Sequence, residues 1–142
     1  MNIKPIHPNF KMPQYSSEMA GGLDLFMPTR GTVNQQDPEG TMVGLGFAAA
    51  VPEGHVALLL PRSGAGAKKG VSLNNTVGVI DPDYRGEWKA CLRVKNKAPL
   101  KWEAGEKLLQ AVIVPVARVE LNQVEDLDET VRGDGGFGST GS

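Results

Sequence analysis

Apolar residues occur in short runs along this chain of 142 residues, and polar turn residues separate the runs. The clearest pattern lies in residues 88–95, where large apolar side chains alternate with mostly charged ones. A period of two is typical of a β-strand that has one face in the core and the other towards water or a partner chain. The core positions of this predicted strand are Trp88, Ala90, Leu92 and Val94.

Further runs predict additional strands. Residues 55–61 and 108–116 are more continuously apolar, as strands of a sandwich or of a subunit interface would be. Shorter runs occupy 22–26, 44–51 and 116–121, while 65–70 and 71–79 fit no period clearly. The eighteen glycines and ten prolines divide these runs. We therefore predict an all-β fold, a jelly-roll-like sandwich or barrel of roughly seven to ten short strands. The polar residues 28–41 are interpreted as a hairpin excursion from it.

Composition narrows the class of protein. The length fits one domain, and 15 basic against 16 acidic residues give a formal net charge of −1, which favours neither nucleic acid nor a membrane surface as partner. The apolar runs are far too short to span a bilayer. The single cysteine, Cys91, excludes an intrachain disulfide and fits a reducing compartment. We expect a soluble, cytoplasmic protein.

Three segments carry residue types suited to phosphate or nucleotide chemistry. Residues 132–142 and 61–70 combine arginine and serine with glycines whose backbone N–H groups can converge on an anion. In residues 74–90, Asp81 ends a short apolar strand and is followed by Pro-Asp, a turn signature. Each segment alone has a simpler interpretation, namely a solvated tail, a basic surface loop and a turn with a structural aspartate.

Taken together, five segments resemble the five motifs of the homotrimeric dUTP diphosphatase (dUTPase) family in order and spacing. They read GLDL, PRSG, NNTVGVIDPDYRGE, GEKLLQAVIVP and RGDGGFGSTG, between about Gly21 and Gly141. The chain departs from the pattern in three places. Alanine stands one position early in AGGLDL, which spares Asp24; Lys107 replaces a common arginine, which would weaken any bidentate contact there; and residues 28–41 are longer than expected.

The resemblance implies an activity and an assembly. Residues 1–131 would form the β domain and residues 132–142 a glycine-rich lid that orders over bound nucleotide. The implied reaction is hydrolysis of dUTP to dUMP and pyrophosphate, by in-line attack of a water oriented by Asp81 on the α-phosphorus. This reaction limits uracil in DNA and supplies dUMP for thymidylate synthesis. The implied assembly is a homotrimer whose sites are each shared between subunits.

The resemblance also assigns residues to the substrate. A β-hairpin around the third motif would read uracil and deoxyribose, with Phe137 of the lid stacking on the base: Asn75, Gly78, Val79, Ile80, Tyr84 and Phe137. The implied phosphate ligands are Arg62, Ser63, Gly64, Gln110, Arg132, Gly138, Ser139 and Thr140. Mg²⁺ would be held mainly by the triphosphate, with Asp24 contacting it through water.

Two other functions stay open at this point. The sister dCTP deaminase of the same trimeric fold needs a glutamate beside the base, and Glu87 is the only carboxylate near the right place. A trimer that senses dUTP or docks a regulatory protein, through the 28–41 excursion, belongs to a different functional class. A Ser-His-Asp triad or a histidine metal site has no support, because His7 follows a proline-rich start and His55 precedes a strand.

Overall fold

The structure is a computed structural model, and it describes residues 1–35, 37 and 39–136. Twelve strands and one short helix are present in these residues. In chain order they are β1 (Asn2–Pro5), β2 (Gln14–Tyr15), β3 (Leu23–Leu25), β4 (Gly31–Val33), β5 (Thr41–Gly44), β6 (Phe47–Ala50), β7 (His55–Pro61), α1 (Ser63–Lys69), β8 (Val71–Leu73), β9 (Gly78–Ile80), β10 (Lys89–Val94), β11 (Leu100–Trp102) and β12 (Leu109–Pro115).

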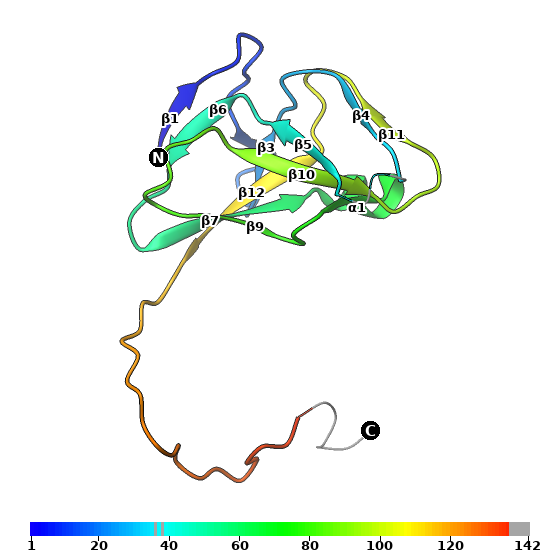
Figure 1. Ribbon diagram of the computed structural model, residues 1–142. Helices are drawn as coiled ribbons and strands as arrows, with labels where there is room; N and C mark the ends of the chain where they lie inside the picture. The colour runs from blue at the N-terminus through cyan, green and yellow to red at the C-terminus, as the bar shows by residue number, and fades with distance from the viewer. Residues whose placement is uncertain (36, 38, 137–142) are drawn as a thin grey trace.

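The strands form four antiparallel sheets that wrap around one core (Figure 1). The largest has the order β2-β3-β12-β7-β9, and a second has the order β5-β10-β8. Two pairs, β1-β6 and β11-β4, complete the set. The all-β prediction is therefore confirmed. The strand number exceeds the predicted range because strands of two or three residues are too short to show a period.

The alternation predicted for residues 88–95 is confirmed. Along β10 the burial pattern is exposed, buried, intermediate, buried, exposed, buried, and Trp88 just before it is 1% exposed. Trp88 packs on Phe47 of β6, with ring centroids 5.1 Å apart. Burial of each such large side chain contributes about 1.5–3 kcal/mol to folding. This core fixes β10, one wall of the pockets described below.

The excursion predicted at residues 28–41 is not a hairpin. Its two strands pair elsewhere, β4 with β11 and β5 with β10. At the first pairing Gly31 lies against the Trp102 ring, so closely that a Cβ would stand 2.2 Å from it. The hairpin interpretation missed these pairings because the segment is polar on average, although Pro28 and Val33 are buried.

The predicted surface loop at residues 61–70 contains helix α1. The helix buries Ala65 and ends at Gly70, whose φ of 71° is the left-handed conformation that terminates helices. Lys68 and Lys69 occupy its last turn, where positive charge is favourable. The sequence did not predict this helix because it contains Gly64 and Gly66, and glycine is a poor helix former. At seven residues it is also the longest helix described, so no described helix could cross a membrane.

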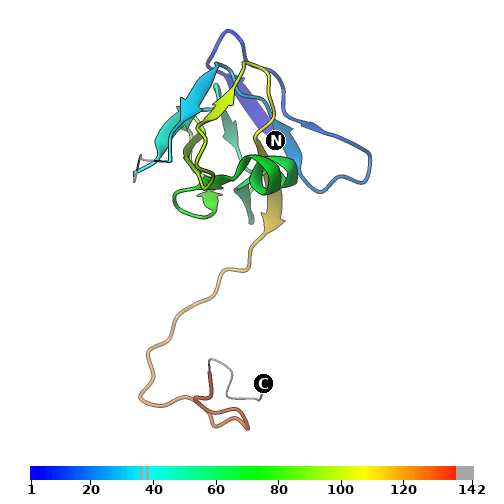
Figure 2. The same cartoon turned by 90° about the vertical axis from the view of Figure 1, so that its right-hand side faces the viewer.

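The strand predicted at residues 116–121 does not form. After β12 the chain leaves the β domain as an extended segment (Figures 1 and 2), and residues 117–134 are all exposed. A strand needs a partner, and this segment pairs with no strand among the described residues. The packing of the described residues ends near Pro115, and the domain boundary at residue 131 stays a prediction. Apolar side chains stay exposed along the segment: Val119, Leu121, Val124, Leu127 and Val131.

Candidate functional site

The register of the largest sheet brings three of the sequence motifs together. Asp24 on β3 pairs with Gln110 on β12, which pairs with Leu60 on β7. Directly opposite residues in antiparallel strands share one face of the sheet. Arg62 follows β7 by one residue, so it emerges beside the carboxylate of Asp24.

Asp24 is the centre of an ion-pair cluster. It is 4% exposed, and its Oδ1 lies 2.7 Å from Nε of Arg62 while its Oδ2 lies 2.8 Å from Nζ of Lys107. The two cations are about one-third exposed, at 34% and 31% of their side chains. One carboxylate against two cations leaves a net positive charge at the surface. Sequence reasoning treated Lys107 only as a weakened arginine and did not identify it as the partner of Asp24.

Gln110 is held in place from two sides. Its Nε2 donates to the carbonyl of Pro61 at 3.2 Å. Its Oε1 lies over Gly22, where a Cβ would stand only 2.6 Å from it. The glycine of the first motif thus makes room for the glutamine of the fourth.

Next to this cluster lies a pocket of about 440 Å³ with a positive lining. It is lined by Arg62, Gly64, Ala65, Lys68, Lys69, Gly105, Glu106, Lys107 and Leu108. The hydrogen bond from Lys69, at 2.8 Å, lowers the pKa of Glu106, and the backbone N–H of Glu103 lowers it further. Ser63 and Gly64 stand in the first turn of α1, which holds no acidic residue. The pocket suits an anion with several charges.

The third motif connects the two main sheets. β8 pairs with β10 and β9 pairs with β7, so the β-hairpin expected here is not formed. The turn between them places Thr76 at φ 65°, a conformation that is costly for a β-branched residue and often marks a functional site. A pocket of about 450 Å³ opens there. Its lining includes Asn75 and Gly78, whose contact with the base stays a prediction, and Lys89 and Ala90 of β10, which sequence reasoning did not assign to a site.

The predicted turn after β9 is present. The N–H of Tyr84 donates to the carbonyl of Asp81 at 3.2 Å, which closes the turn around Pro82. Asp81 is exposed at the strand end and lines a pocket of about 910 Å³ together with Asp83 and Arg85. Val79 and Tyr84 are exposed, while Ile80 packs against the core.

The two groups of residues lie at opposite ends of β7. Ala57 pairs with Ile80, which sets Asp81 beside Val56, whereas Arg62 follows the other end of the strand. Six residues of extended chain span roughly 20 Å. Asp81 and the ion-pair cluster of one chain are therefore too far apart to contact the same phosphorus atom.

Comparisons with known proteins decide the family. A dUTPase family model matches residues 8–141. The chain belongs to the dUTPase family. A deoxyuridine 5′-triphosphate nucleotidohydrolase of Hydrogenobaculum sp. is 42% identical over 139 residues, which cover 98% of this chain and 96% of the relative. Its counterpart in Chromobacterium violaceum is also 42% identical, over 92% of this chain and 87% of the relative.

Solved structures of the family share the fold. The Staphylococcus bacteriophage 80alpha dUTPase with dUPNHPP is 27% identical, with a TM-score of 0.87 and coverage of 99% of this chain and 98% of that one. A mutant dUTPase of S. aureus phage phi11, described with a structural Mg(II) ion, is 25% identical, with a TM-score of 0.81 and coverage of 90% and 98%.

Within the dUTPase fold, the side chain of Glu87 binds to the backbone of its own chain. Its Oε1 accepts a hydrogen bond from the N–H of Gly46 at 3.0 Å, and it packs so closely on Gly44 that a Cβ there would stand 2.4 Å away. A carboxylate engaged with backbone in this way does not face a nucleotide base. The observation argues against the deaminase reading.

The dUTPase lid motif is only partly within the described residues. Arg132 is exposed, and its Nε donates to the carbonyl of Gly135 at 2.9 Å. The predicted contacts of Phe137, Gly138, Ser139 and Thr140 fall outside the described residues.

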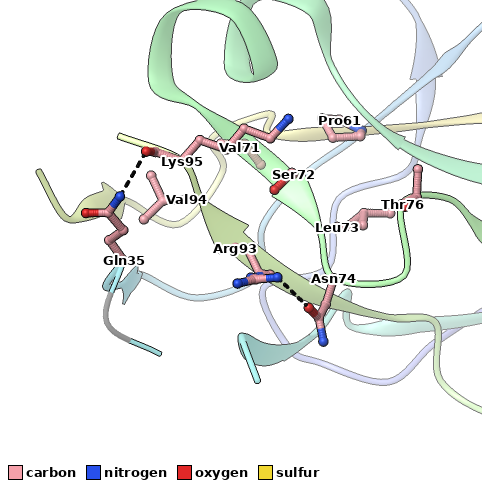
Figure 3. Close-up of a pocket in the computed structure, with 10 residues that line it drawn as sticks. All are labelled: Gln35, Pro61, Val71, Ser72, Leu73, Asn74, Thr76, Arg93, Val94 and Lys95. Atoms are coloured by element: carbon pink, nitrogen blue, oxygen red, sulfur yellow. Dashed lines mark hydrogen bonds between the residues drawn. The ribbon is translucent and has the colours of Figure 1, made fainter. Parts of the chain in front are cut away.

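A hollow of about 750 Å³ lies between β8, β10 and the end of β4 (Figure 3). Arg93 donates to Asn74 at 3.2 Å, and Gln35 donates to the carbonyl of Lys95 at 3.2 Å. The hollow adjoins the third-motif pocket, because Leu73 and Asn74 line both, and Thr76 of the turn lines it as well.

Proposed function

We propose that this chain hydrolyses dUTP to dUMP and pyrophosphate in a homotrimer whose active sites are each built from several subunits. The observation that carries the proposal is the arrangement of the dUTPase motifs. The motifs form two groups. One lines the cationic pocket beside Arg62 at one end of β7, and the other places the exposed carboxylate of Asp81 at the other end. Family membership supplies the reaction, and the separation of the two groups supplies the reason for sharing sites.

Asp81 is the catalytic residue of this proposal. Its carboxylate, exposed at the end of a rigid strand, orients a water for in-line attack on the α-phosphorus. The new bond joins the water oxygen to that phosphorus, and the bond from the α-phosphorus to the bridging oxygen breaks. Pyrophosphate leaves with the bonding electrons, and the water proton passes through Asp81 to solvent.

The phosphates are bound in the cationic pocket beside Arg62, which a neighbouring subunit supplies. Arg62 is pre-oriented because its Nε lies 2.7 Å from Oδ1 of Asp24 and its Nη1 donates to the carbonyl of Lys107 at 3.4 Å, which leaves Nη2 to face an anion. Gln110 contacts the α-phosphate region, and Ser63 and Gly64 the inner phosphates. Lys107 adds a positive charge that sequence reasoning did not assign. The lid contributes Arg132, Gly138, Ser139 and Thr140.

Base and sugar are selected in the pocket between the two main sheets. Asn75, Gly78, Val79 and Ile80 surround the uracil, where a thymine methyl meets steric exclusion and cytosine leaves polar groups unpaired. Tyr84 lies against the deoxyribose and leaves no space for a 2′-hydroxyl. Phe137 stacks on the base from the lid.

Mg²⁺ fits this site as an ion carried by the substrate. Both carboxylate oxygens of Asp24 contact cations, and the described residues contain no group of three or more His, Cys, Asp or Glu that could hold a metal. An ion that prefers phosphate oxygens and its own waters suits such a protein. When bound, it neutralises charge on the triphosphate. Asp24 retains lone pairs through which a water of that ion is contacted.

The deciding experiment is pyrophosphate release from dUTP, dTTP, dCTP and UTP, each with and without Mg²⁺. The proposal requires that pyrophosphate be released quickly from dUTP but not from the other three nucleotides, and that this release depend on Mg²⁺. Ammonia released from dCTP would instead establish the deaminase. Sedimentation of the same sample tests the trimer.

A regulatory partner bound through residues 28–41 stays a second prediction. Directly after this segment, Met42 of β5 is 63% exposed at the edge of the sheet formed by β5, β10 and β8. An Asp81→Asn variant separates the two functions. It removes hydrolysis while leaving a purely regulatory effect intact, and loss of both effects would favour the enzyme alone.

A further inference from the structure

Tyr84 has little support from neighbouring side chains, although the proposed function asks it to form a rigid wall. It is 43% exposed. Its backbone N–H closes the turn on Asp81, and its hydroxyl donates to the carbonyl of Glu87 at 3.1 Å. Both of these bonds are made to backbone carbonyls, and Arg85 in turn donates to the carbonyl of Tyr84 at 3.1 Å.

Gly86 is the backbone on which the ring rests. A Cβ at this position would stand 2.4 Å from Oη, 2.6 Å from Cζ and 3.0 Å from Cε2 of Tyr84. Ordinary contacts of this kind begin at 3.4 Å. The conflict therefore involves the rigid ring as well as the hydroxyl, and the ring would have to move by about 1 Å.

The requirement for glycine here is one of space. Gly86 is absent from the described residues with positive φ, so alanine is compatible with its backbone. Gly21 offers a matched comparison, because it too lacks a positive φ and a Cβ there would meet nothing within 4 Å.

We propose that Gly86 is a specificity-determining residue that acts through Tyr84. The missing side chain lets the phenol ring lie flat on the backbone and bond to Glu87, and this position sets the space left at the 2′ carbon of the sugar. Adding one methyl group displaces the ring and opens the wall to ribonucleotides. The inference rests on the proposed function, since it concerns the sugar contact of that site.

The test compares kcat/KM for dUTP and UTP in the wild type, Gly86→Ala and Gly21→Ala. The ratio of dUTP to UTP is expected to fall by about tenfold or more in Gly86→Ala, the size of one steric contact in a pocket. It should stay unchanged in Gly21→Ala. An unchanged or raised ratio in Gly86→Ala overturns the inference, even if both substrates react more slowly.

A double-variant comparison separates positioning from a general structural effect. In a Tyr84→Ala background, Gly86→Ala should leave the ratio where Tyr84→Ala alone sets it, because no ring remains to be displaced. A further fall would show that Gly86 acts by another route. A wild type without any preference for dUTP over UTP would refute the proposed function together with this inference, whereas preference retained in Gly86→Ala refutes the inference alone.

Discussion

The ion-pair cluster around Asp24 permits a quantitative prediction for Asp24→Asn. The substitution keeps the size of the side chain and removes its charge, leaving Arg62 and Lys107 as neighbouring cations with no carboxylate between them. Breaking a fully buried pair costs about 3–5 kcal/mol, and breaking an exposed pair costs about 0–1 kcal/mol. Here the carboxylate is buried and both cations are about one-third exposed. We therefore expect a loss of about 2–3 kcal/mol in the free energy of unfolding.

The assay is denaturant unfolding at one fixed protein concentration, because trimer formation would link stability to concentration. Thermal unfolding should shift down by about 5–10 °C for a chain of this size. The KM for dUTP should rise as well, because Arg62 loses its anchor. Lys107→Met removes one pair and leaves the other, so its cost should be nearer 1 kcal/mol. Asp128→Asn, the same change at an exposed position, is the control.

One result would refute this reasoning. If Asp24→Asn unfolds within about 0.5 kcal/mol of Asp128→Asn, the two ion pairs contribute no more than exposed pairs do. An unchanged KM would additionally show that Arg62 is not positioned by the carboxylate.

Three further predictions concern other parts of the chain. Asp81→Asn should lower turnover by at least about a hundredfold while dUTP binding, measured by calorimetry, persists; normal turnover would exclude the catalytic role. A chain ending at Val131 should unfold like the wild type yet turn over dUTP far more slowly, and equal rates would exclude the lid. Glu106→Gln tests pH linkage. Because Lys69 lowers the pKa of folded Glu106, the stabilisation is present above its ordinary, unfolded pKa and is lost as pH falls through the folded value. Urea unfolding should therefore show a deficit of about a few tenths of a kcal/mol at pH 7, since the pair is exposed, and the deficit should disappear as the pH falls through the folded pKa of Glu106; a deficit independent of pH would contradict the assignment.

Much of the fold could be predicted because a few strands carry their whole signal locally. β7 and β10 are long enough for apolar pattern to show, and each lies close to its predicted range. β4 and β5 could not be predicted, since their pairing with β11 and β10 depends on residues about 50 to 70 positions away. Helix α1 was missed for a related reason, as burial of Ala65 outweighs the poor local propensity of its glycines.

In the site, too, the sequence indicated which residues to consider but not which of them are in contact. The order of the motifs was enough to name Asp24, Arg62 and Asp81 as candidate functional residues, a prediction that the experiments above test. It did not show that Lys107 would reach Asp24 across 83 positions, because that contact exists only through the register of β3 with β12. The close approach of Tyr84 to Gly86 was hidden as well, since it depends on the shape of a turn.

The position of the motifs on β7 also supports the proposal that each site is shared between subunits. Both ends of the strand are anchored in the largest sheet, by β9 near Asp81 and by β12 along its whole length. The separation of roughly 20 Å is therefore a fixed property of the sheet, which no loop movement can close. In the proposed assembly, a nucleotide whose base and sugar lie near Asp81 of one chain would take its phosphate ligands from the β7 end of another. The exposed apolar side chains beyond β12 fit this proposal, because a segment that packed on a neighbouring subunit would not contact its own domain.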